Sequence, residues 1–433
     1  MNEIELFARG PIDKLDPETL NRLMDRAPTD DEALTGTVRR LIDTVRARGD
    51  VVLKEMAEEF DHVTLKALEV PRSAWDAALT ALDRHVRSAM ERAADNIRRF
   101  HTVQIPGPAM LEVEPGVRVT RVWAPLGRVG VYAPGGRAAY PSSVLMGVVP
   151  AKAVGVPDVI VCSPPDTSGL PPIAVLAACA VAGADRLFAV GGAGAIAALS
   201  YGTQSVPRAD AIVGPGNRWV TEAKRQVAGD VLIDAPAGPS EVLVIADETA
   251  DPLLIAHELL AQAEHDPEAA CGLVTTSKDV ADATELQLQA QLSSAPRSEV
   301  AKAALATWGV ILTADSLDEA IDFAARYAPE HLSVMAADAP GYAKRISTAG
   351  TIFVGSAASV AFGDYMTGAN HVLPTSGRAR SFSGLSSNHF MRSFTIQEID
   401  PRGAASMAKD VSVLAEAEGF PAHAAAALAR SQP

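Results

Sequence analysis

With 433 residues, 48% of them hydrophobic, and 32 glycines, the chain can bury sizeable cores, and its length predicts roughly two to four globular domains. A net charge of −15 argues against a nucleic-acid partner, because neutralising phosphates requires a basic face. The sequence has no apolar secretion signal and no stretch of about eighteen apolar residues, which disfavours secretion and membrane insertion. The 3 cysteines form no Cys-x-x-Cys pair, so we expect reduced, buried thiols and a cytoplasmic location.

The first part of the chain is predicted to be helical. Between residues 17 and 102, apolar residues recur at three- and four-residue spacing, with charged residues between them. Residues 117–122 then alternate like a strand. We therefore expect residues 1–125 to form a helical lead segment that runs into a first α/β module.

From Gly127 onward, short apolar and β-branched runs alternate with helical patterns. The strands expected here are 128–131, 159–162, 187–190, 211–213, 242–245, 272–275, 310–312, 332–335 and 351–354. This alternation predicts parallel sheets with helices on both faces, and so many strands predict two doubly wound, Rossmann-like modules, at 126–235 and 236–385. The Pro- and Gly-rich segment 234–240 would be the crossing between them, and residues 386–433 would form a small helical tail domain.

Glycine-rich turns follow several of the expected strands. Residues 192–197 (GAGAIA) fit the letter of a dinucleotide-binding fingerprint, and Asp210 supplies an acidic residue about 20 positions on. The same glycines also suit tight turns and close helix packing, so this signal is weak alone. The turns at 134–136 and 214–217 end expected strands, where open parallel sheets bind ligands.

Four residues are candidate metal ligands. Gln262 and His265 lie three apart on a predicted helix at 251–265 and therefore share a face. Such a pair also suits a surface or capping role, but Asp364 and His423 supply further donors in segments that resemble loops or helix starts. Two imidazoles, a carboxylate and an amide oxygen suit Zn²⁺.

Glu330 and His331 form a candidate acid–base pair, expected at the carboxyl end of an α/β unit. A neighbouring carboxylate and imidazole suit proton transfer, because small changes of environment bring either pKa near neutral pH. The alternative interpretation is a capping or ion-paired glutamate beside a packed imidazole.

Seven ordered motifs along nearly the whole chain resemble those of the histidinol dehydrogenase family. They are VYAPGG (131–136), VGPGN (213–217), PAGPSE (236–241), QAEH (262–265), APEH (328–331), GDY with NHVLPT (363–375) and EAEGFPAH (416–423).

The resemblance implies a zinc- and NAD-dependent enzyme that oxidises L-histidinol to L-histidine through L-histidinal, using two NAD per product. It implies that Gln262, His265, Asp364 and His423 hold one zinc ion per subunit and that Glu330 and His331 transfer protons. In the first module, the residues that match NAD contacts are Tyr132 and Asn217. The residues that match the substrate pocket lie mostly in the second module and are Ser240, His371, Glu418, His331 and the four zinc ligands. The family is similar in forming homodimers in which the tail of one subunit, with Glu418 and His423, completes the site of the other.

One residue departs from the family pattern. Relatives often carry Gln where this chain has Gly194, so one side-chain contact to NAD would be absent or replaced by backbone.

Two other functions are alternatives to this one. A paralogous NAD-dependent dehydrogenase acting on another polar alcohol, such as a sulfonated diol, is the nearest alternative. A non-catalytic zinc-binding scaffold protein, from a different class, would have no use for the Glu330–His331 pair.

Overall fold

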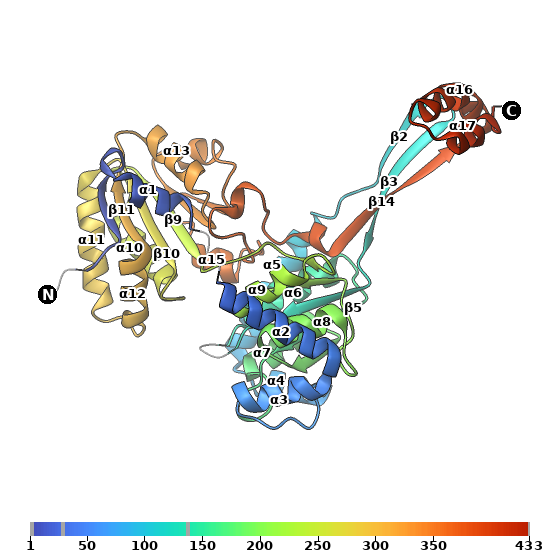
Figure 1. The fold of residues 1–433 in the computed structure, drawn as a ribbon. Helices are drawn as coiled ribbons and strands as arrows, with labels where there is room; N and C mark the ends of the chain where they lie inside the picture. Colours follow the sequence, from blue (N-terminus) through green and yellow to red (C-terminus); the bar gives the residue numbers. More distant parts are fainter. Residues whose placement is uncertain (1–3, 27–30, 136–138, 432–433) are drawn as a thin grey trace.

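The computed structural model describes residues 4–26, 31–135 and 139–431 of the chain. These residues form two α/β modules, each built on an open parallel sheet, and an arm that projects away from both (Figure 1). The structure thus has the predicted fold class. Within the described ranges, no helix is long and apolar enough to cross a membrane.

The first module is built on a parallel sheet whose first strand in the chain lies in the middle. In spatial order its strands are β6 (Arg186–Ala189), β5 (Asp158–Ser163), β4 (Arg128–Tyr132), β7 (Ala211–Val213) and β8 (Leu232–Ile233). Its helices are α2 (Glu32–Arg48), α3 (Asp50–Phe60), α4 (Arg72–Ala81), α5 (Arg84–Thr102), α6 (Pro141–Ala153), α7 (Ile173–Ala182), α8 (Gly192–Tyr201) and α9 (Arg218–Val227). Helix α2 packs on α8 and α9, whereas α4 and α5 pack on α7 and α6, so helices shield the apolar strands on both faces.

The second module repeats this plan. In spatial order its strands are β1 (Ala8–Pro11), β11 (Gly309–Thr313), β10 (Ala270–Thr275), β9 (Glu241–Ala246), β12 (His331–Met335) and β13 (Thr351–Val354). Its helices are α1 (Pro17–Met24), α10 (Pro252–Ala263), α11 (Lys278–Leu292), α12 (Ser298–Trp308), α13 (Leu317–Tyr327), α14 (Ala339–Ala343) and α15 (Val360–Tyr365). One hydrophobic core lies under α10 to α12 and another under α1, α13 and α14, on opposite faces of the sheet.

The lead segment is divided between the two modules, which differs from our expectation of a single segment before the first. Strand β1, which we did not predict, pairs with β11, and α1 packs on α13 of the second module. Helices α2 to α5 cover the first module instead. The chain therefore passes from the second module to the first after α1, and returns at 234–240, between β8 and β9.

The arm is a three-stranded antiparallel sheet in the order β14-β3-β2, followed by two helices. Its elements are β2 (Ala109–Glu114), β3 (Val117–Pro125), β14 (Met391–Ile399), α16 (Pro401–Ala417) and α17 (Pro421–Leu428). Figure 1 shows α16 and α17 at the far end of the arm, away from both parallel sheets. Large apolar side chains on the arm are exposed, among them Met110, Leu111, Phe394 and Ile396.

His101 makes the stability of the first module sensitive to acid. It is fully buried on α5, and burial lowers its pKa to about 4. An unfolded histidine titrates near 6.5, so below that pH the unfolded chain binds the proton more tightly than the folded one. Stability from a neutral His101 is complete above about pH 6.5 and is lost as the pH falls toward 4.

Between pH 7 and pH 4.5, we expect the free energy of unfolding to fall by about 2 kcal/mol more in the wild type than in a His101→Gln variant. Urea titrations of both proteins at the two pH values measure this. The change in unfolding free energy between the two pH values isolates the titration of His101, because any cost of the substitution itself is the same at both pH values. Equal losses in the two proteins would contradict the assignment.

Candidate active site

Glu330 and His331 lie side by side at the start of β12. Helix α13 ends at Tyr327, and buried Ala328 takes a left-handed conformation (φ 50°) that turns the chain into the strand. The pair therefore lies at the amino end of β12, where His331 is in register with Val242 of β9. Our prediction of the carboxyl end was wrong, because the turn between helix and strand is only three residues long and the strand begins at His331 itself.

The backbone of Glu241 sets the orientation of His331. Nδ1 of His331 lies 2.9 Å from the carbonyl oxygen of Glu241, and a carbonyl oxygen can only accept, so Nδ1 carries a proton. Nε2 is therefore the nitrogen that gains or loses a proton when the ring titrates. It is buried, has no hydrogen-bond partner among the described residues, and lies 3.6 Å from Oδ1 of Asp364. The ring thus presents its basic nitrogen toward Asp364.

Glu330 and His331 are electrostatically coupled. Both are 4% exposed, and Glu330 Oε2 lies 3.4 Å from Nδ1 of His331. Burial raises the pKa of Glu330, although the charge of His331 opposes the shift. Burial alone would lower the pKa of His331, but the carboxylates of Glu330 and Asp364 outweigh it and hold that pKa well above its usual value. The two groups titrate as a couple that can hold and pass on a proton.

A cavity of about 190 Å³ adjoins this couple. It is lined by His331, Thr351, Ile352, Phe353, Gly363, Asp364, Thr367, Ala369, Asn370, His371 and Leu373. Nδ1 of His371 contacts the backbone oxygen of Asp364 at 3.1 Å. Burial raises the pKa of Asp364, but the nearby His331 and the charges of His371 and His265 outweigh it and lower that pKa. The cavity is therefore bounded by an anionic carboxylate and imidazole rings.

Three of the four candidate metal ligands lie near one another. Gln262 is buried on α10, and its side-chain nitrogen has no partner within the described part of the chain. One turn earlier, Glu258 accepts a 2.9 Å bond from Val360 N at the start of α15, which ties α10 to the helix that carries Asp364. His265 follows just beyond the end of α10, and its charge acts on Asp364.

The fourth candidate ligand, His423, does not join the other three within one subunit. It is exposed on α17 at the far end of the arm (Figure 1). Glu418, which caps the end of α16, is exposed there as well. The described residues accordingly contain no cluster of three His, Cys, Asp or Glu side chains able to hold a metal. A buried side-chain amide, whose oxygen can bind a metal, an imidazole and a carboxylate nevertheless fit a zinc ion whose last ligand comes from elsewhere.

The candidate NAD residues flank the point where the strand order of the first sheet reverses. Strands β5 and β6 lie on one side of β4 and strands β7 and β8 on the other, and dinucleotides bind at the carboxyl ends of such a pair. Tyr132 ends β4, and its hydroxyl accepts a 3.1 Å bond from Gly192 N. Asn217 follows β7 and caps α9 by accepting bonds from the backbone nitrogens of Trp219 and Val220.

Gly214 shapes the same turn, because its φ of 116° suits glycine and a Cβ there would collide with the backbone oxygen of Tyr132. We expect Gly214→Ala to weaken NAD binding at least about tenfold, since the backbone must move in the turn between Tyr132 and Asn217. Titration of NAD followed by protein fluorescence measures this. Gly229→Ala, at a position where a Cβ meets nothing within 4 Å, is the matched control. Unchanged affinity in Gly214→Ala would contradict the role of the turn.

Gly194 lies on α8 against the lead segment of the chain. A Cβ at this position would approach Met56 Cε to 2.8 Å and Leu53 Cδ2 to 3.2 Å. Side chains of α3 thus fill the space that a glutamine would need. This packing suits a glycine at this position.

Ser240, Asn370 and Glu241 lie around the same site. Ser240 is half-buried and immediately precedes β9, next to Glu241. Asn370 lines the cavity and orients its wall, because its side chain donates to Met146 O at 2.8 Å and accepts from Val372 N at 3.0 Å. Asn370 and Glu241 lie within two of the sequence motifs, but we did not predict their roles, because each contacts residues that are distant in the sequence.

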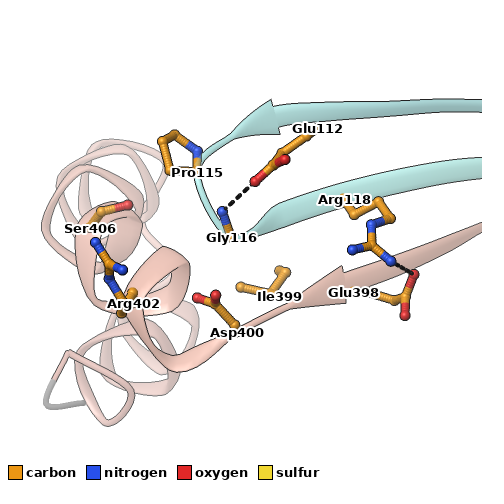
Figure 2. A pocket seen from close by; sticks show the side chains of 9 residues that line it. All are labelled: Glu112, Pro115, Gly116, Arg118, Glu398, Ile399, Asp400, Arg402 and Ser406. Carbon is orange, nitrogen blue, oxygen red and sulfur yellow. Dashed lines mark hydrogen bonds and ion pairs between the residues drawn. The ribbon is translucent and has the colours of Figure 1, made fainter.

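A separate hollow of about 700 Å³ lies on the arm (Figure 2). It is lined by Glu112, Pro115, Gly116, Arg118, Glu398, Ile399, Asp400, Arg402 and Ser406. Asp400 caps α16 through Gly403 N, and Glu112 accepts from Gly116 N at the β2–β3 turn. Asp400 N also donates to Gly116 O at 2.9 Å, which joins the start of α16 to the β2–β3 turn. The hollow therefore belongs to the construction of the arm and is remote from the acid–base couple.

Two doubly wound modules, a strand-order reversal flanked by glycine turns, and a buried acid–base couple define a class of enzyme, the NAD-dependent oxidoreductases. The family model of histidinol dehydrogenase matches residues 24–431. The chain belongs to the histidinol dehydrogenase family.

Individual relatives agree with this assignment. The chain is 48% identical over 395 residues to the histidinol dehydrogenase of Methanosarcina mazei, covering 91% of each chain. It is 48% identical over 411 residues to that of Natronomonas pharaonis, covering 95% of this chain and 96% of the relative. The crystal structure of histidinol dehydrogenase from Elizabethkingia anophelis superposes with a TM-score of 0.94 at 34% identity, covering 99% of both chains.

Proposed function

We propose that this chain catalyses the zinc-dependent, four-electron oxidation of L-histidinol to L-histidine through L-histidinal, the last steps of histidine biosynthesis. The single observation that carries the proposal is His331, whose unpartnered Nε2 lies 3.6 Å from Asp364 at the wall of a small cavity. A base held in that position suits removal of a proton from a bound alcohol.

Gln262, His265 and Asp364, with His423 of a second subunit, would hold the zinc ion. In that place the ion would orient the substrate through its amine and imidazole groups. His371 and Ser240 would line the substrate pocket from the second module, and Glu418 from the second subunit. The spacing of Gln262 and His265 at the end of α10, with Glu258 tying that helix to α15, supports the metal assignment.

The chain's own groups carry the proton transfers. His331 Nε2 takes the hydroxyl proton while the carbinol carbon is oxidised. Glu330, coupled to His331, then takes a proton from the water that adds to the aldehyde, while protonated His331 returns its proton to the aldehyde oxygen to give the hydrate. His331, again unprotonated, takes a hydroxyl proton of the hydrate in the second oxidation. Tyr132 and Asn217 would hold NAD⁺, which would accept one hydride in each oxidation, so two NAD⁺ would be used per product. Two neighbouring bases thus serve the successive proton losses.

We also propose a homodimer in which the arm of each subunit reaches the second module of the other. The exposed apolar side chains of the edge strands β2 and β14 support this, because edge strands with such a surface are unusual in a protein that stays monomeric. The free, buried thiols of Cys162, Cys179 and Cys271 support a cytoplasmic location.

The substrate is tested by following NADH absorbance with L-histidinol, and with a sulfonated diol as the competing substrate. We expect L-histidinol to be oxidised with a kcat/KM at least about a hundredfold higher, because polar groups that bind an amino alcohol reject analogues lacking its amine. A preference for the sulfonated diol would favour the paralogous enzyme, and no NADH with either substrate would favour a zinc-binding scaffold.

The metal is tested by removing it. We expect a chelator to abolish turnover and added Zn²⁺ to restore it, with one zinc bound per subunit in the restored protein. Elemental analysis of the chelated and restored samples provides the count. Full turnover in a sample free of metal would contradict the proposed ligand set.

A further inference from the structure

Arg26 lies two residues beyond the end of α1 and is buried although it carries a charge. Its guanidinium forms a two-pronged ion pair with Glu241, with Nε to Oε1 and Nη2 to Oε2 both at 2.9 Å. The two residues are 215 positions apart. Arg26 also donates to the backbone oxygens of Leu23 and Tyr327, and its guanidinium lies 3.4 Å from the centre of the Tyr327 ring.

Glu241 contacts both members of the acid–base couple through its backbone. Its nitrogen donates to Glu330 Oε2 at 2.7 Å, and its carbonyl oxygen accepts from Nδ1 of His331 at 2.9 Å. Its carboxylate accepts from Ser376 N at 2.8 Å and from Glu330 N at 3.4 Å. The orientation of Glu330 and His331 therefore depends on where Glu241 lies.

Arg26 holds the couple from two sides. Glu241 begins β9, the strand next to β12, and Tyr327 ends α13, three residues before Glu330. Because Arg26 binds both, it fixes the strand on which the couple rests and the turn that leads into it. The fork of a guanidinium suits this task, since its donors have a fixed planar geometry that lysine cannot reproduce.

We propose that Arg26 is a positioning residue for the oxidation, acting through Glu241 and Tyr327 to hold Glu330 and His331 in place. The inference rests on the proposed function of that couple. It assigns a catalytic purpose to the lead segment, which on sequence alone carried no chemistry.

The test is a cycle of three variants: Arg26→Gln, Glu241→Gln and both together, each assayed as the purified full-length enzyme loaded with zinc. We expect Arg26→Gln to lower kcat by about tenfold to a hundredfold, with the KM for L-histidinol within about twofold of wild type and the zinc content unchanged. The solvent deuterium isotope effect on kcat should increase, because proton transfer then limits turnover. A loss of folded protein alone would change neither the isotope effect nor the KM for L-histidinol.

The double variant separates positioning from stability. Removing both charges leaves no lone buried ion, so we expect its melting temperature to recover toward wild type. We expect its kcat to stay low, because the fork that locates Glu241 is still missing. If kcat recovers together with the melting temperature, Arg26 is only structural and the inference is overturned.

Arg22→Gln is the matched control, because it makes the same change on α1 where the side chain is exposed and faces Phe7 and Trp308. It should retain wild-type kcat. If Arg26→Gln does not fold, Arg26→Lys replaces it, and a wild-type kcat and isotope effect in Arg26→Lys would likewise overturn the inference. A wild-type protein that does not oxidise L-histidinol would overturn the proposed function instead, so the two failures are distinguishable.

Discussion

Replacing His331 by Asn is expected to lower the kcat of L-histidinol oxidation by about a hundredfold to ten-thousandfold, the range typical of losing a general base. An asparagine amide can still donate to the carbonyl oxygen of Glu241, as Nδ1 of His331 does, but it offers no basic nitrogen on the side of Asp364. Zinc content should stay at the wild-type level, because His331 is not one of the proposed ligands.

Steady-state kinetics and elemental analysis of the same samples provide both readouts. His85→Asn, the same change at an exposed position on α5, is the control and should behave like the wild type. Full activity in His331→Asn would remove the central base from the mechanism. Loss of zinc from His331→Asn would show instead that the residue acts on the metal.

Mixing two inactive variants is expected to restore activity if the arm completes the site of a second subunit. His331→Asn damages the second module, and His423→Asn damages the arm. In a mixed dimer with shared sites, one site receives an intact module from one subunit and an intact arm from the other. With random exchange half of the dimers are mixed, so we expect about a quarter of wild-type activity from an equimolar mixture.

Partial unfolding and refolding of the mixture allows subunits to exchange, and a purification tag on one variant measures how much exchange occurred. Each variant treated alone is the control and should stay inactive. If tagged and untagged subunits copurify but no activity returns, His423 does not act across subunits. If they never copurify, the protein does not form the proposed dimer.

The strands of the two parallel sheets could be predicted from the sequence for a physical reason. A strand covered by helices on both faces is mostly apolar, so β5 and β9 are predicted from short β-branched runs and β12 from a short, mostly apolar run. The missed strands lack this signal. β1 is an edge strand that contains Arg9 and Pro11, β8 has two residues, and β14 is almost entirely exposed.

The candidate site was predictable in its chemistry but not in its geometry. Residue types and motifs identified Glu330, His331 and the suspected zinc ligands. No spacing rule could indicate that α10 and α15 are tied through Glu258, or that His423 lies at the end of an arm. Arg26 was missed altogether, because an arginine just beyond the end of a polar helix has no sequence signal of its burial against Glu241.

The central claim is that a single site carries out both oxidations, and the yield of NADH from a limiting amount of L-histidinol tests it most directly. With NAD⁺ in excess and the reaction run to completion, we expect each L-histidinol consumed to give two NADH and one L-histidine. One NADH per substrate, with L-histidinal accumulating, would contradict the role of Glu330 and His331 in the second oxidation. No NADH from the zinc-loaded enzyme would contradict the proposed substrate itself.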